Sequence, residues 1–211
     1  MSIRGYFLDL DGTVYRGDKL LPGAKEAIEV LRSRGRKILF LSNKPLDSRK
    51  QYAQKLSRLG IFVEDKDIIN SSLVLARYLA EESPGARVFA IGEPPLLDEL
   101  QRAGLQLTEN PRQIEYVVAG FDRTFNYRKL NIAFQALRRG ARFYATNPDR
   151  TCPVEDGEIP DAGAVIAALE ATSGRKVEKI FGKPSQYMVE VALEVLGLPA
   201  EACAMVGDRL E

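Results

Sequence analysis

The chain has 211 residues, a length that suits one domain with an insertion or two small domains. Its 30 Lys and Arg residues nearly balance its 29 Asp and Glu residues, so the formal charge of +1 gives no sign of the basic surface of a nucleic-acid-binding protein. The absence of histidine excludes Ser-His-Asp and Cys-His catalysis and every His-ligated metal site. Any chemistry must therefore depend on carboxylates, Lys, Arg, hydroxyl groups or a hard metal ion.

The cysteines and apolar segments predict a cytoplasmic protein with no membrane partner. Cys152 and Cys203 are far apart and lack the spacing of a metal site, which is typical of a reducing compartment. Asp9 and Asp11 interrupt the short apolar start, so we expect no signal peptide. No window approaches the roughly 18 apolar residues of a membrane span.

Apolar runs alternate with helical patterns along most of the chain. In chain order, the expected elements are a strand at 3–9, a helix at 24–34, a strand at 37–43, helices at 47–59 and 71–82, a strand at 87–92, a helix at 96–104, a strand at 116–121, a helix at 130–140, a strand at 141–147, a helix at 162–174, a strand at 179–182, a helix at 185–197 and a strand at 202–208. This alternation is typical of a parallel α/β sheet. We therefore predict an α/β fold with a Rossmann-like parallel core sheet and an inserted α/β cap domain.

The first strand ends in two aspartates, within the sequence FLDLDGT (7–13). Side chains at positions i and i+2 of a strand point to the same side, so Asp9 and Asp11 are expected to lie together at the strand tip. Two carboxylates this close repel each other, and partial burial increases the cost. The pattern therefore indicates that a positive charge belongs at this tip.

Polar side chains also follow other predicted strands. Ser42 and Asn43 end the second strand, Lys183 follows 179–182, and Asp208 ends the last strand. Ligands of open α/β sheets bind at the carboxyl ends of the strands, so we expect these residues at one edge of one sheet. On that assumption, residues 1–77 and 179–211 form the core, and residues 78–178 form the inserted cap.

These side chains suit a phosphate group and a magnesium ion. Mg²⁺ prefers oxygen ligands and takes one or two carboxylates together with substrate phosphate. A carboxylate can act as the nucleophile and form an aspartyl-phosphate, while a second, protonated carboxylate supplies the leaving oxygen with a proton. Gly12 would let backbone amides approach the phosphate closely.

Four motifs in order, DLDGT, LSN, GKPS and MVGDRLE, resemble those of the haloacid-dehalogenase (HAD) superfamily of phosphatases. The middle block, with VVAGFDRTFNY and ATNPDRTCPVEDG, looks like the large cap of the NagD-like, or p-nitrophenylphosphatase-like, branch, and closest to the arabinose-operon sugar phosphatases. The resemblance implies that Asp9 is the nucleophile and Asp11 the general acid/base. It also implies Mg²⁺ ligation by the carboxylates of Asp9 and Asp208 and the backbone carbonyl of Asp11.

The same resemblance implies that Ser42 and Lys183 hold the phosphoryl oxygens, with Asn43 beside them orienting Asp9 or the leaving group. The cap loop from Asn147 to Gly157 would face the substrate. Within it Asn147, Asp149 and Arg150 are candidates for substrate selection, although Asp149 and Arg150 also suit an ordinary polar loop. The expected partner is a small phosphorylated metabolite, and the resemblance allows a homo-oligomer that forms through the cap.

Two alternatives remain open at this point. The same residues could serve a phosphotransferase or phosphomutase that passes the phosphoryl group to a sugar hydroxyl, or a phospho-acceptor module that is phosphorylated without turnover. In the related family the fourth motif continues into a second acidic residue and further strands, whereas this chain stops at Glu211. We therefore expect a sequence truncated within that motif.

Overall fold

The computed structural model describes residues 2–44, 46–154 and 156–208. Its contacts divide the chain into two units, the first made of Met1–Ser42, Asp47–Asn70 and Pro184–Glu211, and the second of Asn43–Leu46 and Ser71–Lys183. The second unit thus extends a few residues beyond the predicted cap of 78–178 at both ends. The chain passes between the units after residues 42, 46, 70 and 183.

The first unit is built on a four-stranded sheet in which every neighbouring pair is parallel. The spatial order is β13-β1-β4-β5. Its strands are β1 (Gly5–Asp9), β4 (Lys37–Ser42), β5 (Ile68–Asn70) and β13 (Cys203–Val206). Leu8 pairs with Phe40 on one side and with Val206 on the other, which brings the carboxyl ends of β1, β4 and β13 to one edge.

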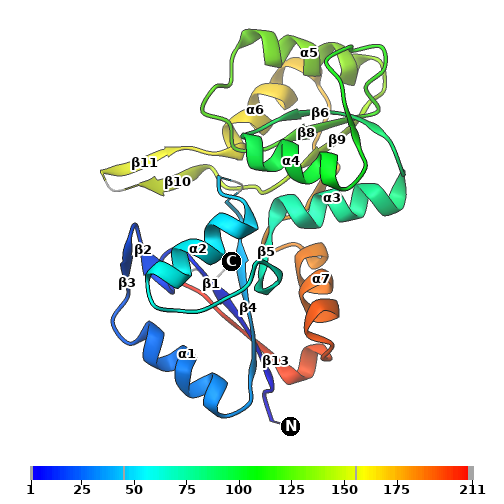
Figure 1. Cartoon of the computed structure of the whole chain (residues 1–211). Coiled ribbons are helices and arrows are strands. Elements are labelled where there is room, and N and C mark those ends of the chain that lie inside the picture. Colours follow the sequence, from blue (N-terminus) through cyan, green and yellow to red (C-terminus); the bar gives the residue numbers. More distant parts are fainter. Residues whose placement is uncertain (1, 45, 155, 209–211) are drawn as a thin grey trace. The chain divides into compact units, whose positions relative to one another are not determined.

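Helices cover both faces of this first sheet (Figure 1). Its helices are α1 (Ala24–Ser33), α2 (Arg49–Arg58) and α7 (Gln186–Leu196), with short 3-10 turns η1 (Asp65–Asp67) and η2 (Ala200–Ala202) and a small hairpin, β2 (Tyr15–Arg16) and β3 (Lys19–Leu20). Alternation along the strands sorts the side chains between the faces. Leu8 and Phe40 pack with Leu56 of α2, whereas α7 contacts β4 and β5 from the opposite side.

The second unit contains a five-stranded parallel sheet of its own. Its order is β12-β9-β8-β6-β7. The strands are β6 (Arg87–Ile91), β7 (Gln106–Leu107), β8 (Tyr116–Ala119), β9 (Arg142–Ala145) and β12 (Lys179–Ile180). Its helices are α3 (Ser71–Glu82), α4 (Pro94–Arg102), α5 (Tyr127–Arg138) and α6 (Ala162–Ser173), and β10 (Thr151–Val154) and β11 (Gly157–Pro160) form an antiparallel hairpin. Both units therefore have the predicted parallel α/β architecture.

Two cores stabilise the two faces of the second sheet. On one face, Ile91 and Phe143 pack against α5 and α6. On the other, the buried Tyr144 donates its hydroxyl hydrogen bond to Glu82 of α3 (2.9 Å) and contacts the ring of Phe181. Burial and the hydrogen bond to Glu82 raise the pKa of Tyr144, so its phenol stays protonated.

Helix boundaries follow the capping residues. Ser48 begins α2 with a capping box in which its side chain accepts from the backbone of Gln51 and the Gln51 side chain accepts from the backbone of Ser48. Gly174 and Gly197, both in the left-handed conformation, end α6 and α7. Among the described residues, no helix is both long enough and apolar enough to cross a membrane.

One expectation about the sheets is wrong. The strand that precedes Lys183 was expected in the same sheet as β1, but β12 pairs with β9 in the second sheet, with Lys179 opposite Tyr144. The edge position next to β4 is taken instead by β5, which the sequence pattern did not separate from the start of α3. Only backbone pairing decides this choice, since short apolar strands such as 179–180 suit either sheet.

The buried ring of Phe40 should be essential for the stability of the first unit. Phe40 is fully buried, whereas Phe62 in the same unit is 79% exposed. Phe40→Ala should lower the free energy of unfolding by about 3–5 kcal/mol because it leaves a cavity, whereas Phe62→Ala should change it by less than about 0.5 kcal/mol. Urea unfolding followed by circular dichroism measures both, and equal losses would contradict the packing described above.

Candidate active site

The chain turns tightly immediately after β1. Oδ1 of Asp9 accepts a hydrogen bond from the backbone of Leu10 (2.7 Å), and Leu10 itself is fully buried. The Leu10 carbonyl accepts from Val14 (2.9 Å), and the Gly12 N–H donates to the Tyr15 carbonyl (2.8 Å). Backbone hydrogen bonds therefore hold the part of the turn that carries the two predicted catalytic carboxylates.

Gly12 is required where this turn approaches the end of β13. Its φ is 84°, and a Cβ atom at this position would lie 2.2 Å from Oδ2 of Asp208. Asp9 lies beside the same segment, since a Cβ atom on Gly207 would be 4.0 Å from Oδ2 of Asp9. The structure thus brings Asp9, Gly12 and Asp208 together at the edge of the first sheet.

Ser42 ends β4 one residue beyond Leu41, which pairs with Asp9. Its side chain is buried, and its hydroxyl donates to the hydroxyl of Tyr52 on α2 (3.4 Å). The predicted phosphate-binding serine therefore lies on the strand next to that of Asp9, the predicted nucleophile. Tyr52 was not predicted, because nothing in its sequence context separates it from the other core residues of α2.

The electrostatics of this edge favour neutral or positive groups. Burial raises the pKa of the Tyr15 hydroxyl well above its ordinary value, and the nearby charge of Asp11 raises it further. Nζ of Lys55 lies 4.2 Å from the centre of the Tyr15 ring. The Tyr15 phenol therefore stays protonated and adds no negative charge beside the carboxylates.

The first unit offers a donor set that fits a hard divalent cation. In the described part of the chain no group of three or more Asp, Glu, Cys or His side chains could hold a metal ion. A metal here would instead need the two carboxylates of Asp9 and Asp208 and a backbone carbonyl such as that of Asp11, an all-oxygen set that suits Mg²⁺. The hydroxyl of Thr13, next to Gly12, is also buried and has no hydrogen-bond partner within the described residues.

The remaining predicted residues belong to the second unit. Asn43 and Lys183 contact each other directly: Oδ1 of Asn43 accepts from the backbone N–H of Lys183 (2.6 Å), and Nδ2 donates to the Lys183 carbonyl (3.0 Å). Nδ2 of Asn43 also donates to Oδ2 of Asp149 (3.1 Å). The structure therefore brings Asn43, Lys183 and Asp149 together.

The predicted cap residues differ in how their side chains are used. Asn147 is fully buried and donates to Oδ2 of Asp149 (3.0 Å) and to Oδ1 of Asp161 (3.2 Å). Arg150, by contrast, is exposed. The predicted loop from 147 to 157 contains β10 and the start of β11, and Glu155 lies outside the described residues.

Asp161 is a member of this polar network that the sequence analysis missed. It begins α6 by accepting from the backbone of Ala162, and burial raises the pKa of its carboxyl group. Its position just before the helix predicted at 162–174 is typical of a helix cap and gives no sign of a further contact. The contact with Asn147 could not be seen in the sequence because fourteen positions and a hairpin separate the two residues.

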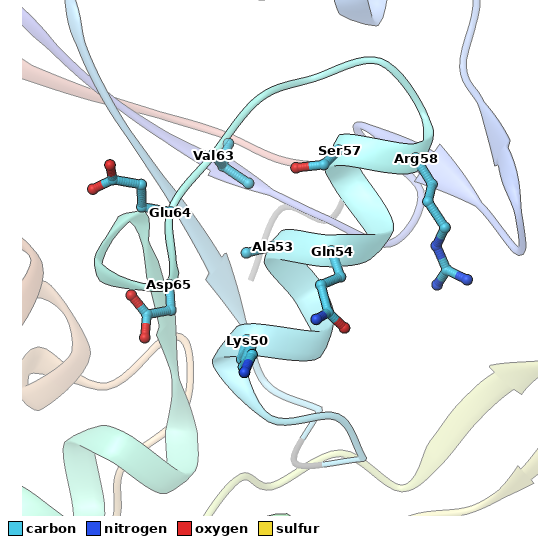
Figure 2. Close-up of a pocket in the computed structure, with 8 residues that line it drawn as sticks. All are labelled: Lys50, Ala53, Gln54, Ser57, Arg58, Val63, Glu64 and Asp65. Carbon is cyan, nitrogen blue, oxygen red and sulfur yellow. The ribbon is translucent and has the colours of Figure 1, made fainter.

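A hollow of about 750 Å³ lies elsewhere on the first unit, beside α2 (Figure 2). It is lined by Lys50, Ala53, Gln54, Ser57, Arg58, Val63, Glu64 and Asp65. None of the predicted site residues lines it, and its basic and acidic side chains give no single charge preference. The candidate active site is therefore the edge that carries Asp9 and Asp208.

A parallel α/β sheet with carboxylates at its carboxyl edge suits an enzyme that handles phosphate groups, and comparison with known proteins agrees. A family model described as haloacid dehalogenase-like hydrolase matches residues 6–106, and a related HAD hydrolase-like model matches residues 180–211. The chain is 43% identical over 211 residues to the sugar-phosphatase AraL of Bacillus subtilis (strain 168), covering all of this chain and 78% of that protein.

Solved structures show the same relationship. A p-nitrophenyl phosphatase from Archaeoglobus fulgidus superimposes with a TM-score of 0.94 at 38% identity, covering 100% of this chain and 80% of that one. NagD from E. coli K-12 superimposes with a TM-score of 0.91 at 30% identity, covering 100% and 81%. The chain therefore belongs to the haloacid dehalogenase-like hydrolases, in their NagD-like phosphatase branch. This confirms the predicted fold class and the predicted enzyme class, a phosphoric monoester hydrolase.

Replacing Gly12 should disable the site more than it destabilises the fold. Gly12→Ala and Gly17→Ala both place a side chain at positive φ, which costs about 1–2 kcal/mol each. Only at Gly12 would the new methyl group collide with Asp208, since nothing lies within 4 Å of a Cβ atom at Gly17. We expect Gly12→Ala to lower kcat for p-nitrophenyl phosphate by about 100-fold or more.

Gly17→Ala serves as the matched control and should retain wild-type kcat. Thermal unfolding of both variants separates loss of folding from loss of activity. Equal kcat values for the two variants would show that the contact between Gly12 and Asp208 is unimportant for the reaction.

Asp161 should make the stability of the second unit depend on pH. Because burial raises its pKa in the folded state, the ionised carboxylate opposes folding at pH 7. Asp161→Asn removes that charge and keeps an oxygen that caps α6, so it should raise Tm at pH 7. The gain should shrink as the pH falls below 3.8, the ordinary pKa, because the carboxyl group then becomes protonated in both states.

Asp161→Ala is the complementary variant, since it removes the cap and should cost about 0.5–2 kcal/mol. Differential scanning calorimetry from about pH 3 to about pH 8, which starts below the ordinary pKa of Asp, measures all three proteins. A Tm of Asp161→Asn below that of the wild type at pH 7 would show that the charge stabilises the fold.

Proposed function

We propose that the chain hydrolyses small phosphate monoesters, sugar phosphates among them, through an aspartyl-phosphate on Asp9 with Mg²⁺ as the cofactor. The main support is the edge of the first sheet, where Asp208 closely approaches Gly12 and Asp9 lies beside Gly207. The sequence contains no histidine that could act as an alternative nucleophile or base. The similarity to AraL, a sugar-phosphatase, supports sugar phosphates as the substrate class.

In the proposed first step, a carboxylate oxygen of Asp9 attacks phosphorus while the bond from phosphorus to the ester oxygen breaks. Asp11, protonated at this stage, gives its proton to the departing oxygen, so the alcohol leaves neutral. In the second step, Asp11 takes a proton from water as the water oxygen attacks phosphorus. The bond from phosphorus to Asp9 then breaks, which releases inorganic phosphate and restores the Asp9 carboxylate and the protonated form of Asp11.

Charge stabilisation completes the proposal. Mg²⁺, held by Asp9, Asp208 and the Asp11 carbonyl, would neutralise the phosphate and the two carboxylates. We assign the phosphoryl oxygens to Ser42 and Lys183 and to backbone amides near Gly12. The Lys183 ammonium would contribute a second positive charge as the transferring group develops charge on its oxygens.

Substrate selection is proposed for the cap, which we take as residues 78–178. Arg150 is the strongest candidate among Asn147, Asp149 and Arg150, because its side chain is exposed while the Asn147 amide is used inside the second unit. An exposed guanidinium suits the hydroxyl or anionic groups of a small sugar phosphate. The formation of a homo-oligomer through contacts between caps stays a prediction.

Hydrolysis of p-nitrophenyl phosphate and of a panel of sugar phosphates tests the proposal. With Mg²⁺ we expect many turnovers per chain, and EDTA should abolish them. Asp9→Asn should lower kcat by at least about 10³-fold. Asp18→Asn, which changes a fully exposed aspartate in the same unit, should leave kcat unchanged.

A labelling experiment identifies the intermediate. With p-nitrophenyl phosphate labelled in the phosphoryl group, whose leaving group needs no proton, Asp11→Asn should accumulate labelled protein because water activation fails, whereas Asp9→Asn should remain unlabelled. Stoichiometric labelling of the wild type without turnover would instead support the phospho-acceptor module. Transfer of label to an added sugar in place of water would support the phosphotransferase.

A further inference from the structure

The amide of Asn43 is fully used within the second unit. Its oxygen accepts from the backbone of Lys183, and its nitrogen donates to the Lys183 carbonyl and to Oδ2 of Asp149. The orientation of the amide is unambiguous, because a backbone N–H needs an acceptor and a backbone carbonyl needs a donor. An asparagine amide has two N–H groups, so none is left to donate to a phosphate oxygen in this arrangement.

Gly182 makes this contact possible. A Cβ atom on Gly182 would lie 2.6 Å from Oδ1 of Asn43 and 2.8 Å from the backbone oxygen of Thr146. Any other residue would therefore push the Asn43 side chain away from the Lys183 backbone. Close packing therefore requires a glycine at position 182. The N–H of Gly182 also donates to the Thr146 oxygen (2.6 Å), which keeps the two backbones close.

Asn43 also lies where the chain passes between the units. The chain crosses after residue 42, after residue 70 and after residue 183. The Asn43 carbonyl accepts from the hydroxyl of Ser71 (2.8 Å), and the Asn43 side chain binds Lys183. Asn43 thus follows one crossing point and makes hydrogen bonds to the second-unit residues at two others, Ser71 and Lys183.

We propose that Asn43 is a positioning residue that fixes the backbone of Lys183, and thereby the direction of its ammonium group, and is not itself a phosphate ligand. This inference rests on the proposed function, in which Lys183 binds the phosphoryl group. The two hydrogen bonds to the N–H and the C=O of Lys183 hold this residue as a neighbouring strand would. They are needed because the pairing of β12 with β9 ends at Ile180, before Lys183. The shared bond to Asp149 links the lysine to the cap network.

A double-mutant cycle distinguishes positioning from direct contact. Asn43→Ala should lower kcat/KM for p-nitrophenyl phosphate by about 10- to 100-fold, the usual effect of losing a residue that orients a ligand-binding group. In a Lys183→Ala background the same change should lower kcat/KM by less than about 3-fold, because its effect passes through the lysine. Losses that multiply in the double variant would overturn the proposal and assign Asn43 a phosphate contact of its own.

Hydrogen exchange gives a readout that does not need activity. The backbone N–H of Lys183 should exchange slowly in the wild type and at least about 10-fold faster in Asn43→Ala, because its acceptor is lost. Asn131→Ala, at an exposed position on α5, is the matched control and should leave this exchange and kcat unchanged. Unchanged exchange in Asn43→Ala would overturn the proposal whatever the activity shows.

If Asn43→Ala fails to fold, Asn43→Asp replaces it, since its carboxylate keeps the acceptor for the Lys183 N–H and loses the donor to the Lys183 carbonyl and to Asp149. We expect that variant to retain slow exchange at Lys183 and to show a smaller loss of kcat/KM. Fast exchange in Asn43→Asp would overturn the proposal. If the wild type shows no phosphatase activity but its Lys183 N–H exchanges slowly and this depends on Asn43, the proposed function is refuted. The hydrogen bonds by which Asn43 holds Lys183 would still stand.

Discussion

Repulsion between neighbouring carboxylates is the constraint on which the proposed chemistry depends. Parallel pairing of β1 with β13 brings Asp9 and Asp208 to the same edge of the sheet, where Asp208 approaches Gly12 and Asp9 lies beside Gly207. Like charges this close raise the free energy of the folded state unless a cation is bound or one group is protonated. A site that needs a cation to be stable is also prepared to bind an anionic phosphate, since the cation attracts both. This is why a sheet edge without histidine can still support hydrolysis.

The two units position their functional groups by different means. In the first, backbone pairing alone is sufficient, because Asp9, Ser42 and Asp208 each lie at or just beyond the end of a long paired strand. In the second, β12 has only two paired residues and ends before Lys183. A side-chain amide, that of Asn43, binds the lysine backbone where a strand neighbour is lacking. We infer that the shorter strand makes the lysine more sensitive to substitutions around it.

The cap loop shows why polar composition does not by itself identify substrate contacts. Asn147 and Asp149 suited substrate recognition as well as Arg150 did, yet the structure uses the first two in a buried network with Asn43 and Asp161. A buried polar group must find hydrogen-bond partners, and inside the second unit the nearest partners are other loop side chains. In the proposed function, substrate selection is therefore assigned to the side chains of the loop that remain exposed, such as Arg150.

The amino-acid sequence by itself determined the parallel α/β architecture, the helix boundaries set by caps such as Ser48, and the candidate residues at 9, 11, 42, 183 and 208. These features depend on local periodicity and on short motifs, which sequence patterns express directly. Only the tertiary structure decided that β12 joins the second sheet, that β5 completes the first, and that the Asn43 amide binds Lys183. Each of these outcomes is a hydrogen-bond pairing between segments distant in the chain. Such pairings depend on which backbone groups meet in space, and a short apolar strand or a single asparagine is compatible with several partners.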